Sequence, residues 1–217
     1  MVAERVLVAP AELVAHASRG RGFWTDGPDR DAVTAGMFNT VGWFEPRDGV
    51  ETNEQVRQVI PYLLLRSRAG AYFTYRRLPS GGEERLFDLH SIGWGGHVND
   101  ERCAAGLEFG SGVLTPNWIA EGLQRELAEE LDLAPGGPLG RLTLHGFLAL
   151  DETPVDRVHV GVVARLDLAP GAEARCAIRE TDRLAPAGWL SPSELAAHSA
   201  EVAFEGWSRA LIAAGLP

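Results

Sequence analysis

Lysine is absent from this 217-residue chain, in which all twenty basic residues are arginine. That absence excludes a P-loop lysine, a Schiff base with a carbonyl substrate and a lysine general base. Cysteine is scarce as well: Cys103 and Cys176 stand far apart and show no paired spacing. The two cysteines therefore indicate neither a disulfide framework nor a zinc site.

Excess positive charge and long apolar runs are also lacking. The net charge of −10 argues against a nucleic-acid backbone or an anionic membrane as the main partner. No stretch approaches the length of a transmembrane span, and the N-terminus lacks the basic-then-apolar pattern of a signal peptide. We therefore expect a cytoplasmic protein, and the apolar content of 45% is ordinary for a single globular domain.

The first fifty residues have a less regular pattern than the rest. We expect a short strand over 5–8 and a short helix over 11–17. Residues 20–53 are rich in Gly, Asp and Pro with aromatic residues interspersed, which we interpret as an irregular cap packed on the main body. We accordingly predict an N-terminal extension over 1–50 and a catalytic domain over 51–217.

A clearer alternation of strands and helices follows. Strands are predicted over 58–66, 71–77, 86–92, 142–150 and 158–166, a helix after Ser191 and a last amphipathic helix over 202–214. Pro61 inside the first of these strands indicates an edge or a bulge. Ser191 and Glu194 form a capping box. This order of elements predicts an α/β fold with a mixed sheet flanked by helices.

Residues 115–133 are the stretch around which the chain is organised. Thr115 and Pro116 are typical of an N-cap and a first helical residue. One apolar face is formed by residues that recur every four positions, namely Ile119, Leu123, Leu127 and Leu131. A polar, glycine-containing insertion over 99–114 precedes this helix.

Three glutamates of that helix lie on or near its apolar face. With Ile119 at zero, Glu130 falls at about 20°, Glu126 at about 340° and Glu129 at about 280°. A buried carboxylate is costly unless a cation meets it, and neighbouring carboxylates raise each other's pKa. Oxygen ligands without His or Cys suit Mg²⁺ or Mn²⁺. The helix sequence alone favours the interpretation that these glutamates form a solvated, ion-paired face. The sequence around the helix favours the other interpretation, a metal site.

These residues resemble the Nudix hydrolase family, whose box reads G-x5-E-x7-R-E-U-x-E-E-x-G-U, where U is bulky and apolar. Its second half is matched in register by Arg125, Glu126, Leu127, Glu129, Glu130 and Leu133, and Gly95-Gly96 resemble its opening glycines. The segments QVIPY, IGWGGH and EGWS at 205–208 are similar to a subgroup of predicted Nudix phosphoesterases with a lengthened box loop. The resemblance spans residues 55–210.

The chain departs from the box in three places. Asn117 stands where the family has its first Glu, and Asp132 where it has a late Gly. Extra residues also separate Gly96 from the helix. The missing Glu is not one of the three helix carboxylates, so we expect metal binding to survive. The loop supplies substitutes for its bracing role in Asp100, Glu101 and Glu108.

The resemblance implies a Nudix-like α/β/α sandwich with a mixed central sheet. It also implies hydrolysis of a nucleoside diphosphate linked to another moiety. It assigns Glu126, Glu129 and Glu130 as Mg²⁺ or Mn²⁺ ligands, completed by the carbonyl of Gly95 or Gly96. Glu126 and Glu129 count as catalytic as well, and Arg125 orients one of the carboxylates by a bidentate contact.

Substrate-binding candidates lie near the glycines. Arg76 and Arg77 are neighbours on a strand, so their side chains point to opposite faces. Either one of them reaches a substrate phosphate or both are surface charges. His97 binds phosphate or satisfies a backbone group, and Trp94 stacks a base or packs. The general base is expected among four carboxylates of later loops, namely Glu152, Asp156, Glu180 and Asp182. We expect packing roles for the aromatic residues Trp24, Trp43 and Trp118, and structural roles for His145 and His159.

Three functions remain open. The first is a metal-dependent hydrolase acting on a small-molecule nucleotide, with no nucleic acid or membrane partner and a homodimer as one option. The second is a non-catalytic Nudix-like sensor that binds a nucleotide or ADP-ribose, which Asn117 and Asp132 favour and the intact glutamates oppose. The third, an isopentenyl-diphosphate isomerase, needs a catalytic cysteine, and Cys103 is out of place for it.

Overall fold

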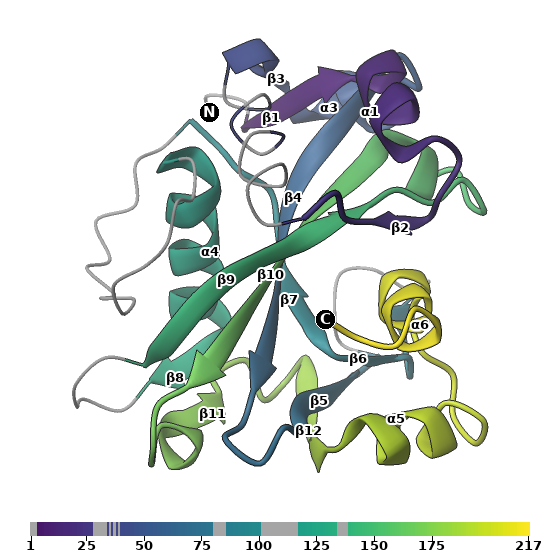
Figure 1. Cartoon of the computed structure of the whole chain (residues 1–217). Helices are drawn as coiled ribbons and strands as arrows, with labels where there is room; N and C mark the ends of the chain where they lie inside the picture. Colours follow the sequence, from purple (N-terminus) through teal and green to yellow (C-terminus); the bar gives the residue numbers. More distant parts are fainter. Residues whose placement is uncertain are drawn as a thin grey trace.

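Strand β4 (Val56–Arg66) lies at the centre of a mixed sheet (Figure 1). The computed structural model describes residues 4–27, 34, 36, 38, 40–79, 86–100, 117–133 and 139–217. Within these residues the sheet path is β12-β5-β4-β10-β9-β2, and β1, β3, β6 and β7 attach beside it. β4 runs parallel to β10 (His159–Leu168), whereas the other named strand pairs in the described part are antiparallel. The prediction of a mixed sheet is confirmed.

The other elements follow in chain order, with their bounds. They are β1 (Arg5–Pro10), α1 (Ala11–Ser18), β2 (Phe23–Trp24), β3 (Trp43–Pro46), α3 (Arg47–Val50), β5 (Tyr72–Arg77), β6 (His90–Ser91), β7 (Gly93–Gly95), α4 (Asn117–Glu130), β8 (Leu131–Leu133), β9 (Gly140–Leu148), β11 (Cys176–Ile178), β12 (Leu184–Leu190), α5 (Pro192–His198) and α6 (Gly206–Ala213).

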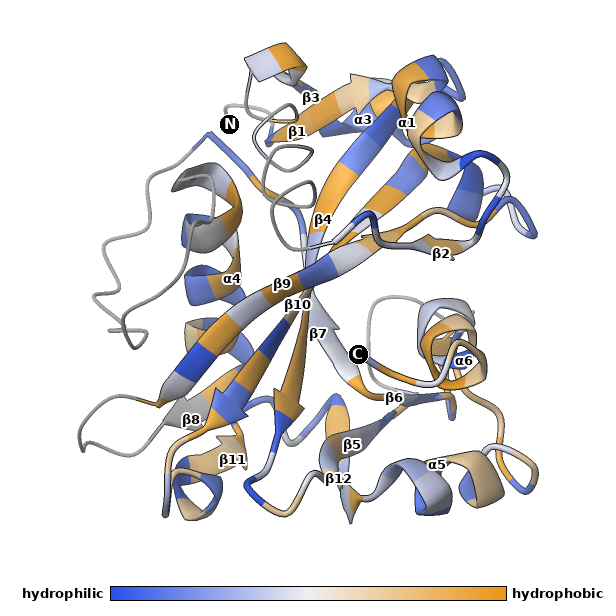
Figure 2. Ribbon diagram, viewed as in Figure 1, coloured by the Kyte–Doolittle hydropathy of each residue, from blue (hydrophilic) through white to orange (hydrophobic). Residues whose placement is uncertain are grey.

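Helices cover both faces of the sheet. Alternate side chains of a strand point to opposite faces, so Leu63 and Leu65 of β4 pack in the cluster that contains the apolar residues of α4. Tyr62 and Leu64 point the other way and pack with Leu195 and Leu211 of the C-terminal helices. β4 is therefore buried along almost its whole length. Figure 2 shows apolar stretches in β4, β9 and β10, interrupted by hydrophilic residues. The α/β/α fold is confirmed.

Pro61 lies inside the central strand, and the prediction of an edge or bulge is wrong. On one side of β4, β1 pairs with residues up to Gln58, and β7 pairs from Tyr62 onward. Pro61 falls between these two partners, so its missing N–H leaves no ladder hydrogen bond unmade on that side. The chain leaves β7 beside this gap, at Gly95, which lies against the carbonyl of Pro61.

The first fifty residues contribute strands to the same sheet. β1 pairs with β3 and β4, and β2 pairs with β9. The aromatic packing we expected is present, because Trp24 and Phe38 both contact Phe147. The segment over 20–53 is thus part of the sheet as well as a cap over it, and the division into two domains at residue 50 stays a prediction.

Helix α4 has the predicted apolar face but is shorter than predicted. Ile119, Leu123 and Leu127 are fully buried. The helix spans Asn117–Glu130, after which Leu131–Leu133 forms β8 and pairs with β11. The predicted cap at residues 115–116 and most of the insertion over 99–114 lie outside the described residues.

The strand predicted over 86–92 is mostly wrong. Residues 86–89 turn, and Asp88 adopts a left-handed backbone with φ of 63°. Only His90–Ser91 form a strand there, β6. The residues that follow, Gly93–Gly95, form β7 on β4. Two short strands joined at Ile92 replace one long strand, since they pair with different partners.

The C-terminal helices cover the second face of the sheet. The predicted capping box is confirmed: the Ser191 hydroxyl accepts from the backbone N–H of Glu194, whose carboxylate accepts from that of Ser191. The last helix, predicted over 202–214, is α6 over Gly206–Ala213. Among the described residues, no helix has the length and apolar character needed to cross a membrane.

Replacing Leu127 by Ala tests how far α4 depends on its buried face. We expect Leu127→Ala to lower the free energy of unfolding by about 2–5 kcal/mol, because it empties a fully buried position. Urea denaturation monitored by circular dichroism measures this. Leu13→Ala, on the less buried face of α1, is the matched control and should lose clearly less. Equal losses in the two variants would contradict the packing described.

Candidate functional site

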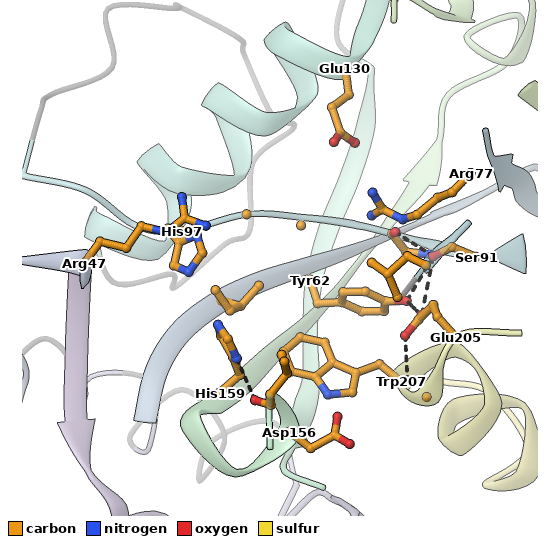
Figure 3. Close-up of a pocket in the computed structure, with 17 residues that line it drawn as sticks. Arg47, Tyr62, Arg77, Ser91, His97, Glu130, Asp156, His159, Glu205 and Trp207 are labelled. Atoms are coloured by element: carbon orange, nitrogen blue, oxygen red, sulfur yellow. Dashed lines mark hydrogen bonds between the residues drawn. The ribbon is translucent and has the colours of Figure 1, made fainter. Parts of the chain in front are cut away.

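A cavity of about 250 Å³ opens beside the gap between β1 and β7. Its walls come from both helical layers and from the centre of the sheet (Figure 3). The residues that line it are Arg47, Ile60, Tyr62, Arg77, Leu86, Ser91, Gly93, Gly95, Gly96, His97, Glu130, Val155, Asp156, His159, Glu205, Gly206 and Trp207. Helix α4 therefore contributes Glu130 from one side, and α6 contributes Trp207 from the other.

Two glutamates of α4 lie at or beside this cavity: Glu126 is buried next to it, and Glu130 is partly buried and lines it. The Glu126 carboxylate lies directly against the backbone of Gly96, where a Cβ would be 2.3 Å from its Oε1, so a side chain at position 96 would displace this carboxylate. Burial raises the pKa of Glu126, and the charge of Glu129 raises it further. Burial, together with the charge of Glu126, raises the pKa of Glu130 to about 8. Oε2 of Glu130 is buried and has no hydrogen-bond partner in the described part of the protein.

Arg125 joins α4 to the segment after β7. Its Nη2 donates to the carbonyl oxygen of His97 and lies 3.3 Å from Oε1 of Glu126. Its Nε lies 3.7 Å from Oε1 of Glu129. Arg125 thus contacts a carboxylate and the backbone beside Gly96, which fits the predicted orienting role.

The three predicted metal ligands of the helix do not all converge. Glu130 lines the cavity and Glu126 lies against Gly96 beside it, whereas the Glu129 side chain is 59% exposed and pairs with Arg125. Among the residues that the structure describes, no group of three or more His, Cys, Asp and Glu is arranged to hold a metal ion. Two carboxylates, one with an unpartnered oxygen, still match how Mg²⁺ binds, through one or two carboxylates together with waters and substrate phosphates.

The predicted phosphate-binding residues separate as strand alternation requires. Arg77 lines the cavity, whereas Arg76 points to the surface and pairs with Asp88 at 3.4 Å. His97 also lines the cavity, and burial with the charge of Arg47 lowers its pKa to about 3, so its ring is neutral. His159, which we predicted to be structural, faces the same cavity, and its ring lies 5.6 Å from that of His97.

Trp94 cannot stack a base in this structure. It is 0% exposed, and its ring lies 4.2 Å from that of Tyr75 and stacks on Phe73. The strand β7 turns this side chain away from the cavity, while its neighbours Gly93 and Gly95 line it. The two other core tryptophans we considered, Trp24 and Trp118, pack on Phe147 and Phe44.

The candidates for the general base occupy different places. Asp156 lines the cavity and accepts hydrogen bonds from the backbone and hydroxyl of Thr153. Glu152 pairs with Arg209 at the surface. Glu180 lies outside the cavity lining but close enough for its charge to raise the pKa of Glu130. Asp182, like His145, does not line the cavity.

Sequence reasoning missed a buried polar network on the α6 side. The Tyr62 hydroxyl donates to Oε1 of Glu205 at 2.5 Å, and Ser208 and Ser91 complete the cluster (Figure 3). Burial raises the pKa of Tyr62 well above its ordinary value. The EGWS segment carried the signal, because its Glu and Ser supply this network, but its spacing alone did not reveal Tyr62 as their partner.

Comparisons with known proteins agree with this geometry. No family model matches the chain. Protein YmaB of Bacillus subtilis (strain 168) is 34% identical over 166 residues, which cover 76% of this chain and 74% of YmaB. The solved structure of Tm1382, described as a candidate Nudix hydrolase, matches with a TM-score of 0.73 at 26% identity and covers 97% of both chains. DR0079 from Deinococcus radiodurans, at 18% identity and a TM-score of 0.50, shares the fold over 82% of this chain and 92% of its own.

The fold and the glutamate-bearing helix beside a glycine strand define a Nudix-like α/β protein. The chain belongs to the same family as protein YmaB, and it shares its fold with the Nudix-like structure of Tm1382. The likeness to Tm1382 supports a hydrolase in general terms.

Glu130 gives the metal-free protein a pH-dependent stability. Its pKa rises from 4.5 to about 8 on folding, so between these values the folded state keeps a proton that the unfolded state releases. The free energy of unfolding should therefore fall as pH rises through this window, by up to about 1.4 kcal/mol per pH unit. Urea denaturation in the presence of a chelator, from pH 5 to pH 8, measures the slope.

Glu130→Gln should flatten this dependence, leaving the smaller part due to Glu126, whose pKa is raised in the same direction. Glu121→Gln, on the same helix but outside the cavity lining, is the control and should keep the wild-type slope. An unchanged slope in Glu130→Gln would show that this carboxyl is not buried as described.

Proposed function

We propose that this protein is a divalent-metal-dependent hydrolase that cleaves a phosphoanhydride bond in a nucleoside diphosphate linked to another moiety. The observation that carries the proposal is the pair of carboxylates on α4, the buried Glu126 and the partly buried Glu130, whose Oε2 has no hydrogen-bond partner among the described residues. Burial and neighbouring negative charge destabilise their ionised forms, and a dication between them and substrate phosphates relieves that cost.

Glu126 and Glu130 would hold Mg²⁺ or Mn²⁺, with a backbone carbonyl of Gly95 or Gly96 and Glu129 from the rim. The bound ion would neutralise the charge of the diphosphate and lower the pKa of the attacking water. Arg125 holds the Glu126 carboxylate and the His97 carbonyl together and so fixes the direction of the carboxylate. Arg77 also lines the cavity and supplies positive charge for a phosphate oxygen.

The cavity offers few groups that take a proton from water. His97 is neutral, and its Nε2 is buried and has no hydrogen-bond partner in the described part of the chain. Asp156 faces the cavity with its carboxylate oriented by Thr153. Of the predicted candidates, Asp156 is the one that lines the cavity, which favours it over Glu152, Glu180 and Asp182 as general base.

Removing one carboxylate at a time tests the proposal. We expect Glu126→Gln and Glu130→Gln each to lower Mg²⁺-dependent release of nucleoside monophosphate by roughly 100-fold or more, since even the outer partners of metal ligands contribute about 10–100-fold. A panel of nucleoside-diphosphate-linked substrates, with and without Mg²⁺, measures activity, and calorimetry measures Mn²⁺ binding. Glu129→Gln should lose less, because that carboxylate lies at the rim.

Glu121→Gln is the control on the same helix and should keep both activity and Mn²⁺ affinity. Full metal-dependent activity in both Glu129→Gln and Glu130→Gln would overturn the assignment of the ligands. Tight nucleotide binding without turnover in the wild-type protein would instead identify a sensor and overturn the hydrolase.

Arg125→Lys separates charge from geometry at the same site. Lysine keeps the charge but loses the planar fork that reaches the His97 carbonyl and Glu126 together. We expect kcat to fall by about tenfold, because the variant loses one charge-assisted hydrogen bond and a loss of ~1.4 kcal/mol corresponds to that factor. The protein should stay folded. Arg141→Lys, on β9 away from the cavity, is the control. Wild-type kcat in Arg125→Lys would contradict the orienting role.

A further inference from the structure

The EGWS segment, residues 205–208, forms the cavity wall opposite α4, and the proposed hydrolytic chemistry uses none of it. Glu205, Gly206 and Trp207 line the cavity. Glu205 is the N-cap of α6 and accepts from the backbone N–H groups of Trp207 at 2.8 Å and Ser208 at 2.7 Å. The start of α6 is therefore set by a side chain inside the cavity wall.

Glu205 fixes this wall to the sheet. Its Oε1 accepts from the Tyr62 hydroxyl at 2.5 Å and from the Ser208 hydroxyl at 2.5 Å. Ser208 in turn accepts from the backbone N–H of Ile92 at 3.0 Å. Since these donors occupy the lone pairs of Oε1, the carboxylate orients α6 and does not serve as a proton acceptor for substrate. Glu205 is a positioning residue.

Trp207 is the large side chain that this arrangement holds at the cavity. Its six-membered ring lies on the backbone of Gly161, where a Cβ would be 2.9 Å from Cζ3 of the ring. The ring also meets Tyr62 edge-on, with centroids 5.3 Å apart and planes at 79°. Trp207 is thus supported by the strand and by Tyr62, while it remains only partly buried and lines the cavity.

The rest of the cavity leaves room for a small group beside Trp207. Ile60 and Val155 add apolar surface, and Asp156 adds a carboxylate. The volume of about 250 Å³ is below the range of roughly 300–1,000 Å³ that encloses drug-sized ligands. Figure 3 shows Glu130 and Trp207 on opposite sides of this space. A substrate whose phosphates lie near Glu130 therefore extends its organic part toward the indole.

We propose that Trp207 is the residue that recognises the organic part of the substrate, and that this part is a flat unsaturated ring of the nucleobase kind stacked on the indole. The proposal rests on the proposed function for the position of the phosphates. It replaces Trp94, which is buried, as the stacking residue. Glu205 and Gly161 serve to keep the indole in place, the first through α6 and the second by leaving room for the ring.

Ligand pairs that differ only in the ring test this directly. The probes are AMP, GMP, CMP and UMP, which carry a base, and ribose 5-phosphate, which does not, all in the presence of Mg²⁺. We expect at least one nucleotide to quench tryptophan fluorescence in the wild-type protein. We expect Trp207→Leu to weaken its binding by about tenfold, or ~1.4 kcal/mol, within the range of base–aromatic stacking. Calorimetry should show the affinity for ribose 5-phosphate unchanged.

Two further variants separate stacking from folding. Trp207→Phe keeps a flat ring and should restore most of the nucleotide affinity, whereas a purely structural residue would show no such preference for base-containing ligands. Trp43→Phe changes an exposed tryptophan on β3, outside the cavity lining, and should leave both affinity and quenching unchanged. Circular dichroism establishes that each variant is folded.

Three results would overturn the proposal: no binding of any of the four nucleotides, no loss of affinity in Trp207→Leu, or an equal loss for nucleotides and ribose 5-phosphate. Because the readout is binding, it does not depend on turnover. Trp207-dependent binding without hydrolysis would contradict the proposed function alone. Hydrolysis of nucleotide substrates that is insensitive to Trp207→Leu would contradict this inference alone.

Discussion

The contact between the Glu126 carboxylate and the backbone of Gly96 is the constraint on which the site depends. It combines a glycine directly after β7, which leaves room for the carboxylate, with a carboxylate four residues before Glu130 and a helix that packs close to the centre of the sheet. Arg125 adds a hydrogen bond to the next carbonyl of the same segment, at His97. Charge, backbone shape and helix packing therefore meet at one point, and a change in any of them would disturb the others.

The cost of this arrangement is electrostatic. Burial raises the pKa of both Glu126 and Glu130; the charge of Glu126 raises that of Glu130 further, and the charge of Glu129 raises that of Glu126. A protein built only for stability would place apolar residues at these positions, because α4 already buries Ile119, Leu123 and Leu127 on that side. Retaining two acids among them is typical of a functional site and agrees with the proposed metal site.

The sheet explains why residues so distant in sequence form one cavity. β4 and β10 run parallel at the centre, and β1 and β7 share the far side of β4 without meeting. The gap between them opens where Pro61 needs no partner. Helix α4 closes it from one face and α6 from the other, so that Glu130 and Trp207 face a common space although 77 positions separate them in the printed sequence.

Much of the fold could be predicted because it follows local rules. The apolar period of α4, the long apolar strand β4 and the capping box at Ser191 each depend on neighbouring residues, and all three were confirmed. Predictions failed where the structure of a segment depends on which strand it pairs with. Within residues 86–92 only His90–Ser91 form a strand, which pairs with β5, whereas β4 pairs with the next strand, Gly93–Gly95. Helix α4 ends at Glu130 because the residues after it form β8, which pairs with β11.

The same division applies to the candidate site. Local spacing placed three glutamates near one face of a helix and two arginines on opposite sides of a strand, and the sequence by itself determined that much. Only the tertiary structure decided that Glu129 remains in solvent, that Trp94 is buried and Trp207 is not, and that Tyr62 meets Glu205. The physical reason is that helical and strand periodicity set the direction in which a side chain points. Its burial and its hydrogen-bond partners depend on which segments, distant in sequence, pack against it.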